Sequence, residues 1–194
     1  MKATRKIQAF TERHRLHFFK YIGIFVLILL GFHFLYVALI DENLVIPGLE
    51  GLYFYLQHQL FLHSAWVVEN LWGYDIVREG HSMRFATGGG IVVDESCSAV
   101  KWFAHFLVLM ILFPGPWKHK AWFIPAGLAI THLVNIIRVS GLAVVYVHRP
   151  ENFEFFHDYI FRPFFYFVLF ILWVAWVEWF FLPSRKKKAN GFQD

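Results

Sequence analysis

The sequence is dominated by four apolar runs, which together are too extensive to be buried inside a soluble domain of this size. They cover residues 21–40, 97–113, 121–147 and 161–182. At about 1.5 Å per helical residue, three of them are long enough to cross the ~30 Å of hydrocarbon in a bilayer. The run 97–113 covers only about 24 Å. Charged residues make up 16% of the 194 residues, well below the roughly 25% of a soluble domain. We therefore predict an all-α integral membrane protein with about four transmembrane helices, folded as a single domain over residues 1–194.

The distribution of basic residues predicts the orientation of these helices. Lys and Arg are concentrated in the N-terminal segment 1–20, in the turn Lys118–Lys120 and in the tail 183–194. Such clusters favour the cytoplasmic side of a membrane. Four spans place all three clusters on that side, and eleven of the fourteen acids then lie on the outer side. The high pI is thus explained by membrane orientation, and we expect no nucleic-acid partner.

The segment 41–96 is more polar and forms the predicted outer part of the protein. It holds eight acids and two arginines. Residues 52–73 are apolar but broken by polar side chains, which is typical of a helix lying in the interface. A fifth span there would move two basic clusters to the outside. Asp75–Arg78 and Ile91–Val93, with the turn signal Thr87–Gly90 between them, predict a small β-hairpin.

Three side chains that can do chemistry fall where predicted spans meet the outer face. Cys97, the single cysteine, begins the second predicted span, and 97–182 forms a helical core. Arg138 lies about two and a half turns below the outer end of the next span. His157 lies at the outer end of the last predicted span, 161–182. The predicted topology therefore brings Cys97, Arg138 and His157 to one leaflet.

These residue types suit thiol chemistry. A cysteine attacks as the thiolate, whose pKa falls when a cation lies beside it. Arg138 cannot act as a base, so its expected role is to stabilise a thiolate or an oxyanion, with help from Asn135. His157 is the expected proton shuttle. Asp158 caps the following helix or orients a partner.

Each of these residues also has a structural interpretation. Cys97 alone is often inert packing, and Arg138 has a possible partner in Glu178. Lys101 and His105 form an alternative set, because helical spacing puts them on the face of Cys97. The eleven histidines show no metal-ligand spacing, so we expect no metal or other cofactor.

Three motifs in this order resemble those of the exosortase/archaeosortase family of membrane transpeptidases. They are Glu95-Ser96-Cys97-Ser98-Ala99, Asn135-Ile136-Ile137-Arg138 and His157-Asp158. The resemblance covers about residues 50–170, and the chain is similar to the short members. It departs at Ala99, where the family commonly has glycine, and at Phe161, where a glycine often follows the His-Asp pair.

The resemblance implies a multi-pass enzyme of the bacterial inner membrane with its active site toward the outer face. Its substrates would be exported proteins with a C-terminal sorting signal made of a short motif, a transmembrane helix and a basic tail. Cys97 would form a thioester, Arg138 would stabilise charge and His157 would move protons. Asn135, Ser98, Lys101 and Asp158 would support them or bind substrate. A lipid or glycan at the surface would accept the product, and membrane lipids would surround the enzyme.

Two other functions remain open from the residues alone. A non-catalytic membrane subunit would dock a partner through residues 41–96 and would tolerate Cys97→Ser. A carrier would use Arg138 and the intramembrane histidines to pass an anion, but four spans are few for a carrier and no inverted repeat is visible in the sequence.

Overall fold

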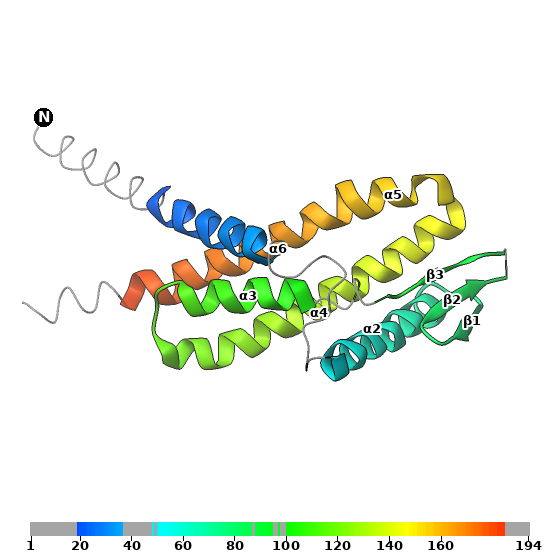
Figure 1. Cartoon of the computed structure of the whole chain (residues 1–194), viewed down its shortest axis with the longest axis horizontal. Helices are drawn as coiled ribbons and strands as arrows, with labels where there is room; N and C mark the ends of the chain where they lie inside the picture. The colour runs from blue at the N-terminus through cyan, green and yellow to red at the C-terminus, as the bar shows by residue number, and fades with distance from the viewer. Residues whose placement is uncertain are drawn as a thin grey trace, which may run out of the picture.

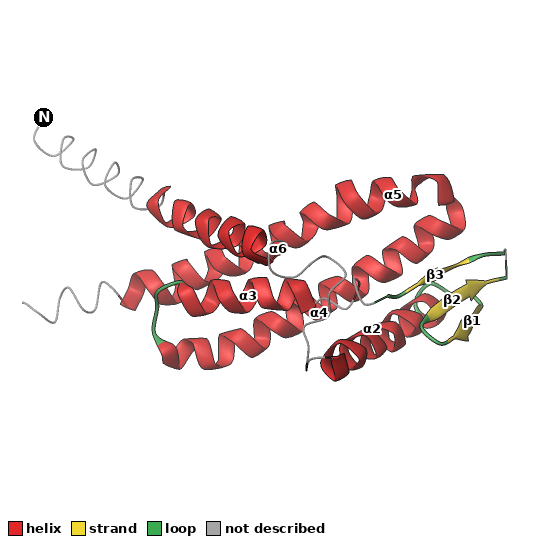
Figure 2. Cartoon of the chain, viewed as in Figure 1, coloured by secondary structure: helices red, strands yellow, loops and turns green. Residues whose placement is uncertain are grey.

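The computed structural model describes residues 19–36, 48, 50–86, 88–94, 97 and 100–184. Most of these residues are helical, and a small antiparallel sheet lies at one end of an elongated molecule (Figure 2). The predicted class, an all-α membrane protein with a small β element, is therefore confirmed. The basic tail 185–194 and most of the N-terminal segment 1–20 lie outside the described residues, as do Ser98 and Ala99.

Three helices in the described part of the chain are long and apolar enough to cross a membrane: Phe19–Tyr36, α4 (Trp117–His148) and the helix over Pro150–Ser184. A shorter apolar helix, α3 (Val100–Leu112), accompanies them. These four correspond to the four predicted spans. Helix α2 (Glu50–Asn70) has 21 residues but is not among the apolar spans, in keeping with the prediction for residues 52–73.

The last helix begins earlier than predicted. The predicted span starts at residue 161, but the chain is already helical from residue 150. Only Arg149, with φ −148° and ψ 67°, separates it from α4. Pro150 then starts a new helix at a position where its missing N–H costs nothing. The segments are a 3₁₀ turn (Pro150–Asn152), α5 (Phe153–Phe155), a π-helix (Phe156–Phe161), α6 (Arg162–Trp176) and a second π-helix (Val177–Phe181).

The sheet has three strands, one more than the predicted hairpin. Strands β1 (Ile76–Glu79), β2 (Ser82–Phe85) and β3 (Gly90–Val92) pair antiparallel in that order. Residues 75–78 therefore do not pair with 91–93, because β2 lies between them. The prediction overlooked the tight turn at Gly80–His81, which reverses the chain after only four residues of β1.

The sheet and α2 pack beside the second half of α4 (Figure 1). Their shared apolar cluster includes Leu60, Met83 and Val139, one from each element. Two polar contacts reinforce it. Arg78 pairs with Glu69, and Gln57 Nε2 donates to the carbonyl of Val93 at 2.7 Å. We call this end of the molecule the sheet end.

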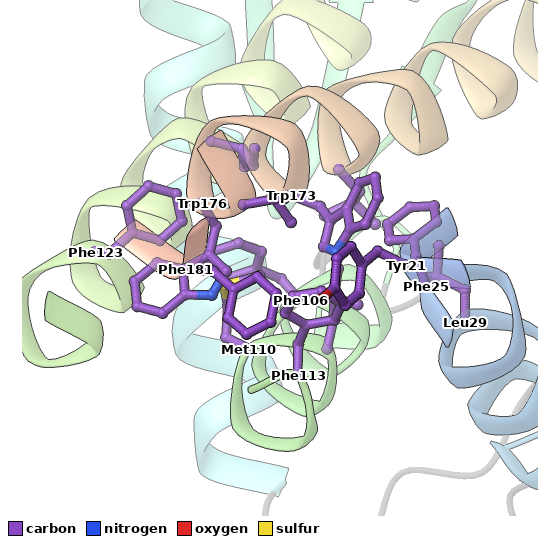
Figure 3. Close-up of a cluster of buried hydrophobic side chains, with 14 of the residues drawn as sticks. Tyr21, Phe25, Leu29, Phe106, Met110, Phe113, Phe123, Trp173, Trp176 and Phe181 are labelled. Carbon is purple, nitrogen blue, oxygen red and sulfur yellow. The ribbon is translucent and has the colours of Figure 1, made fainter. Parts of the chain in front are cut away.

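An aromatic cluster occupies the opposite end, where the N-terminal helix, α3, α4 and α6 converge (Figure 3). Trp173, Trp176, Phe106 and Phe113 are all essentially inaccessible to solvent there. The ring of Phe106 packs directly against Gly127, where an added methyl group would overlap the ring. This close packing of large rings fixes the four helices relative to one another, and so fixes the position of α4 at the sheet end.

Candidate active site

Cys97 lies in a short connection between β3 and α3, and its backbone is held from two sides. Its N–H donates to the carbonyl and to Oδ1 of Asp94, each at 3.1 Å. Its carbonyl accepts a hydrogen bond of 2.7 Å from Asn135 Nδ2 on α4. The residue before Asp94, Val93, is anchored in turn by Gln57. Cys97 lies three positions before Val100, the first residue of α3.

Asn135 connects Cys97 to Arg138. While its Nδ2 donates to the Cys97 carbonyl, its Oδ1 accepts from Arg138 Nη1 at 3.5 Å. The two residues lie three apart on α4 and therefore share a face. Asn135 is fully buried and Arg138 is only 8% exposed. The Asn-x-x-Arg spacing thus places one amide between the cysteine backbone and a buried guanidinium.

Arg138 also contacts the histidine of the last helix. Its Nη2 lies 2.7 Å from His157 Nε2, and His157 Nδ1 lies 2.7 Å from Asp158 Oδ1. The same carboxylate forms an ion pair of 3.1 Å with Arg162, one turn further along. The structure therefore brings Cys97, Arg138 and His157 into one network, as the topology predicted, and Asp158 orients the histidine.

The donors in this network determine the tautomer of His157. A guanidinium can only donate hydrogen bonds, so Nε2 of His157 must be the acceptor. The ring proton is then on Nδ1, from which it is donated to the Asp158 carboxylate. His157 is therefore neutral in this state, and the nitrogen that can accept a proton is occupied by Arg138.

Arg138 itself retains one unused donor. Its Nε is buried and has no hydrogen-bond partner among the described residues. An unpaired donor on a buried cation is costly. A guanidinium N–H is suited to pairing with an anionic oxygen or with an oxygen that develops negative charge.

The environment of the thiol combines opposing effects. Burial raises the pKa of Cys97, and this is the largest effect. The positive charge of Arg138 acts in the opposite direction and lowers that pKa, as expected from the sequence. The nearby Asp94 carboxylate raises it again through its charge and side-chain hydrogen bonding. Burial therefore favours the protonated thiol, and Arg138 is the group that favours the thiolate.

The backbone at His157 depends on a close approach between helices. His157 lies in the π-helix Phe156–Phe161, a wide helical turn often found at functional sites. The ring of Phe161 rests against Gly141 of α4, where an added methyl group would lie 2.6 Å from Phe161 Cζ. Phe161, a departure from the family pattern, is thus accommodated by a glycine on the facing helix.

The alternative set from the sequence lies elsewhere. Lys101 is placed over the ring of Tyr36, at 5.3 Å from its centroid. The ring of His105 packs edge-on against Phe32, and its Nδ1 donates to the Lys101 carbonyl at 2.6 Å. Both side chains thus face the N-terminal helix. Glu178, the possible partner for Arg138, makes none of the contacts described for that arginine. Ser98 is outside the described residues.

Two residues of this network were missed in the sequence. Asp94 lies three positions before Cys97, a spacing at which an Asp side chain commonly accepts from the backbone. This signal was available. Gln57 donates a hydrogen bond to the carbonyl of Val93, which lies 36 positions away in the sequence. A local sequence pattern cannot predict such a contact.

Within the described residues, no group of three or more His, Cys, Asp or Glu side chains is arranged to hold a metal ion. A comparison with protein families matches residues 18–174 to the family described as transmembrane exosortase (Exosortase_EpsH). No curated protein and no solved structure matches the chain. The family match includes α3, α4, the sheet and every residue of the network around Cys97.

Proposed function

The chain belongs to the transmembrane exosortase family, and on that premise we propose that it is a cysteine-dependent transpeptidase with Cys97 as nucleophile. The family is one of multi-pass membrane transpeptidases that act on exported proteins with sorting signals. The observation that carries the proposal is the continuous hydrogen-bonded connection from Cys97 through Asn135 and Arg138 to His157 and Asp158.

The length of α4 supports a site at the outer membrane surface. Its 32 residues span about 48 Å, which exceeds the ~30 Å of hydrocarbon. With Trp117 and Lys118 at the inner surface, Asn135 lies about 27 Å and Arg138 about 31 Å along the helix. The sheet end then faces outward, and Cys97 meets substrates at the boundary between lipid and water.

The first step is activation of the thiol. Arg138 releases Nε2 of His157 and turns its donors toward the thiolate and the carbonyl oxygen of the substrate. His157 Nε2 takes the proton of the Cys97 thiol, and Asp158 stabilises the imidazolium through Nδ1–H. The Cys97 sulfur then attacks the scissile carbonyl carbon, forming the C–S bond of a tetrahedral intermediate.

The second step is collapse and transfer. The oxyanion is stabilised by Arg138, including its otherwise unpaired Nε–H. The C–N bond breaks, His157 gives its proton to the leaving amine, and a thioester to Cys97 remains. A hydroxyl or amine of a surface lipid or glycan then attacks the thioester while His157 takes its proton, the C–S bond breaks, and His157 returns this proton to the Cys97 sulfur. Asp94 and Asn135 hold the backbone of Cys97 through both steps.

The test is to replace Cys97 with Ala or Ser in the source organism and examine exported membrane proteins by mass spectrometry. Precursors that retain a C-terminal transmembrane helix should accumulate in both variants and in Arg138→Gln. Leu27→Ala, a change at an exposed position of the N-terminal helix, should leave processing intact. Normal processing in Cys97→Ser would contradict the proposal and favour a non-catalytic subunit.

The same experiment in water enriched in ¹⁸O separates transfer from hydrolysis. Hydrolysis of the thioester places one ¹⁸O at the new C-terminus of the released protein. Transfer to an acceptor places none and adds the mass of the acceptor. We expect the second result.

A further inference from the structure

Two histidine pairs join α2 to neighbouring elements, and one of them lies next to the strand that leads to Cys97. His58 Nδ1 on α2 lies 3.2 Å from Nε2 of His81, which belongs to the turn between β1 and β2. His63 Nδ1, also on α2, lies 3.0 Å from Nε2 of His132 on α4. The two pairs have the same chemistry, but only the first is connected to the backbone before Cys97.

This connection runs through Val93, the residue that follows β3. Its N–H donates to the carbonyl of His81 at 2.9 Å, which extends the antiparallel pairing of β2 with β3 by one residue pair. Its carbonyl accepts from Nε2 of Gln57 at 2.7 Å, and Gln57 directly precedes His58 on α2. Both backbone groups of Val93 are therefore held by residues that belong to the first histidine pair or adjoin it in the chain.

The position of Val93 affects that of the thiol. The next residue, Asp94, accepts from the N–H of Cys97 through its carbonyl and its Oδ1, each at 3.1 Å. Asn135 holds the carbonyl of Cys97 from the side of α4. The distance between Cys97 and Arg138 thus depends on two anchors, one on α4 and one at the sheet end. A misplacement of about 1 Å at a catalytic group can cost roughly a hundredfold in rate.

The hydrogen bond between His58 and His81 exists only while at least one of the two rings is neutral. A neutral imidazole offers one donor and one acceptor, whereas a protonated imidazole offers two donors. A first added proton can be shared, because the neutral ring still accepts. A second leaves two positively charged donors at a contact of 3.2 Å. Histidine is the side chain whose charge ordinarily changes between about pH 5 and 8, so this contact has a form that mild acid removes.

The surroundings of the pair are aromatic. Its two rings lie against those of Phe54 and Phe61 on α2. Among the described residues, neither histidine takes part in an ion pair. The charged side chains of α2, of the sheet and of its exit have other partners: Glu50 accepts from the backbone of Gly48, Arg78 pairs with Glu69, Arg84 with Glu79, and Asp94 accepts from the backbone of Cys97.

We propose that the His58–His81 pair positions Cys97 through Val93 and thereby makes the enzyme sensitive to mild acid. The inference rests on the proposed function of Cys97 as a nucleophile. Near neutral pH, the pair keeps the turn between β1 and β2 against α2, so Val93 stays in place. When both rings are protonated, the turn moves away from α2 and Val93 moves with it. His58 and His81 are positioning residues, because they act on Cys97 only through the backbone.

Hydrogen exchange followed by mass spectrometry tests the structural part without requiring catalysis. The measured quantity is the protection factor of the Val93 amide, which is corrected for the intrinsic effect of pH, in the full-length protein at about pH 7.5 and about pH 5. His58→Gln is the main variant, because an amide side chain can donate to a neutral imidazole and accept from a protonated one. His63→Gln is the matched control, since it alters a histidine pair that does not hold Val93.

In the wild type, the protection factor of Val93 should be about five- to tenfold lower at the acid pH, as for loss of one hydrogen bond. The same fall should occur in His63→Gln, whereas His58→Gln should keep its protection at both pH values. No fall in the wild type, or an equal fall in His58→Gln, would overturn the proposal.

Processing of an exported substrate tests the functional part. Acid lowers activity in every variant because His157 must be neutral to accept the thiol proton, so the ratio of kcat/KM between each variant and the wild type is compared. For His58→Gln this ratio should be near one at about pH 7.5 and rise about three- to tenfold at about pH 5. For His63→Gln it should stay near one. A constant ratio for His58→Gln would show that the pair does not position Cys97.

The outcome is separable from the proposed function. If Cys97 is required for processing but the exchange of Val93 does not depend on His58, only the positioning inference fails. If Val93 exchanges as expected while Cys97→Ser still processes precursors, the contact between α2 and the sheet stands and the transpeptidase proposal fails.

Discussion

Helix α4 buries two cations, and they differ in how their donors are used. Lys120, 2% exposed, donates to the carbonyls of Ile111 and Phe113 at 3.2 and 2.8 Å. Its Nζ also lies 4.4 Å from the centroid of the Trp117 ring. These contacts satisfy the exposed carbonyls at the end of α3, a position where a cation stabilises a helix. Lys120 is a structural cap.

Arg138, about 27 Å further along the helix, is buried to a similar degree but is not fully paired. One nitrogen has no partner among the described residues, another contact is long at 3.5 Å, and the third holds a histidine. In the sequence, Lys120 belongs to the basic turn Lys118–Lys120 and Arg138 to an apolar run, and neither context shows how the donors are used. Burial does not distinguish these two cations, but the number of donor atoms with a hydrogen-bond partner does.

The largest expected effect is that of Arg138→Gln on activity. Loss of one oxyanion donor costs about 10²–10³-fold in kcat, and we expect a loss of this size in cleavage of a purified exported substrate. The thermal unfolding midpoint in detergent should fall less than in Lys120→Met, because the guanidinium makes only one short hydrogen bond, to His157, and its Nε has no partner among the described residues. A large fall in stability with normal activity per folded molecule would show that Arg138 has a structural role, as Lys120 does.

Lys120→Met should show the opposite pattern. It removes two charge-assisted hydrogen bonds and leaves two carbonyls at the end of α3 without donors, which we expect to cost about 2–4 kcal/mol of stability. Activity per folded molecule should remain near that of the wild type. Unfolding in detergent measures the first quantity and a titration of active sites the second. Unchanged stability would contradict the capping role.

Gly141→Ala should lower both activity and stability, but by less than the two preceding variants lower either one. The new methyl group would press on Phe161, and overpacking of this kind costs about 1–3 kcal/mol. Displacement of the π-helix should also move His157 and lower kcat. Phe161→Leu in the same protein removes the clash and should restore much of the activity. A double variant no better than Gly141→Ala would show that the contact does not position His157.

Asp94→Asn should have the smallest effect. Because the Asp94 carboxylate raises the pKa of the Cys97 thiol, its replacement by a neutral amide should lower that pKa. At a fixed pH below the pKa, a larger fraction of Cys97 is then thiolate, so alkylation by iodoacetamide should be faster. Asparagine can still accept the backbone hydrogen bond, which keeps the turn. Slower alkylation would show that Asp94 acts on the thiol in another way.

Much of this account was predictable because membrane helices leave a strong signal in composition. The apolar runs predicted the spans, and the basic clusters predicted a topology that placed Cys97, Arg138 and His157 together. The Asn-x-x-Arg spacing also predicted that Asn135 and Arg138 share a helical face. In each case the length of an apolar run, the number of basic residues in a segment or the helical spacing of two residues was sufficient.

What was missed depends on contacts between distant segments. Lys120 was interpreted only as a topology signal, because its role as a cap depends on the end of α3 lying beside it. The last helix starts before the predicted residue 161 because Pro150 restarts the helix after a single break at Arg149. The accommodation of Phe161 by Gly141 joins positions on two helices, and neither residue signals the other in sequence.

The measurement that tests the central claim most directly is the rate at which an impermeant maleimide alkylates Cys97 across a pH series in oriented vesicles. The wild type, Arg138→Gln and Lys120→Met would be compared. Since the Arg138 charge lowers the pKa of the thiol, its removal should shift the midpoint of the pH profile upward. Removal of the distant Lys120 charge should leave the midpoint where it is. Equal midpoints in all three proteins, or equal shifts in both variants, would contradict the assignment of Arg138 and Cys97 to one active site.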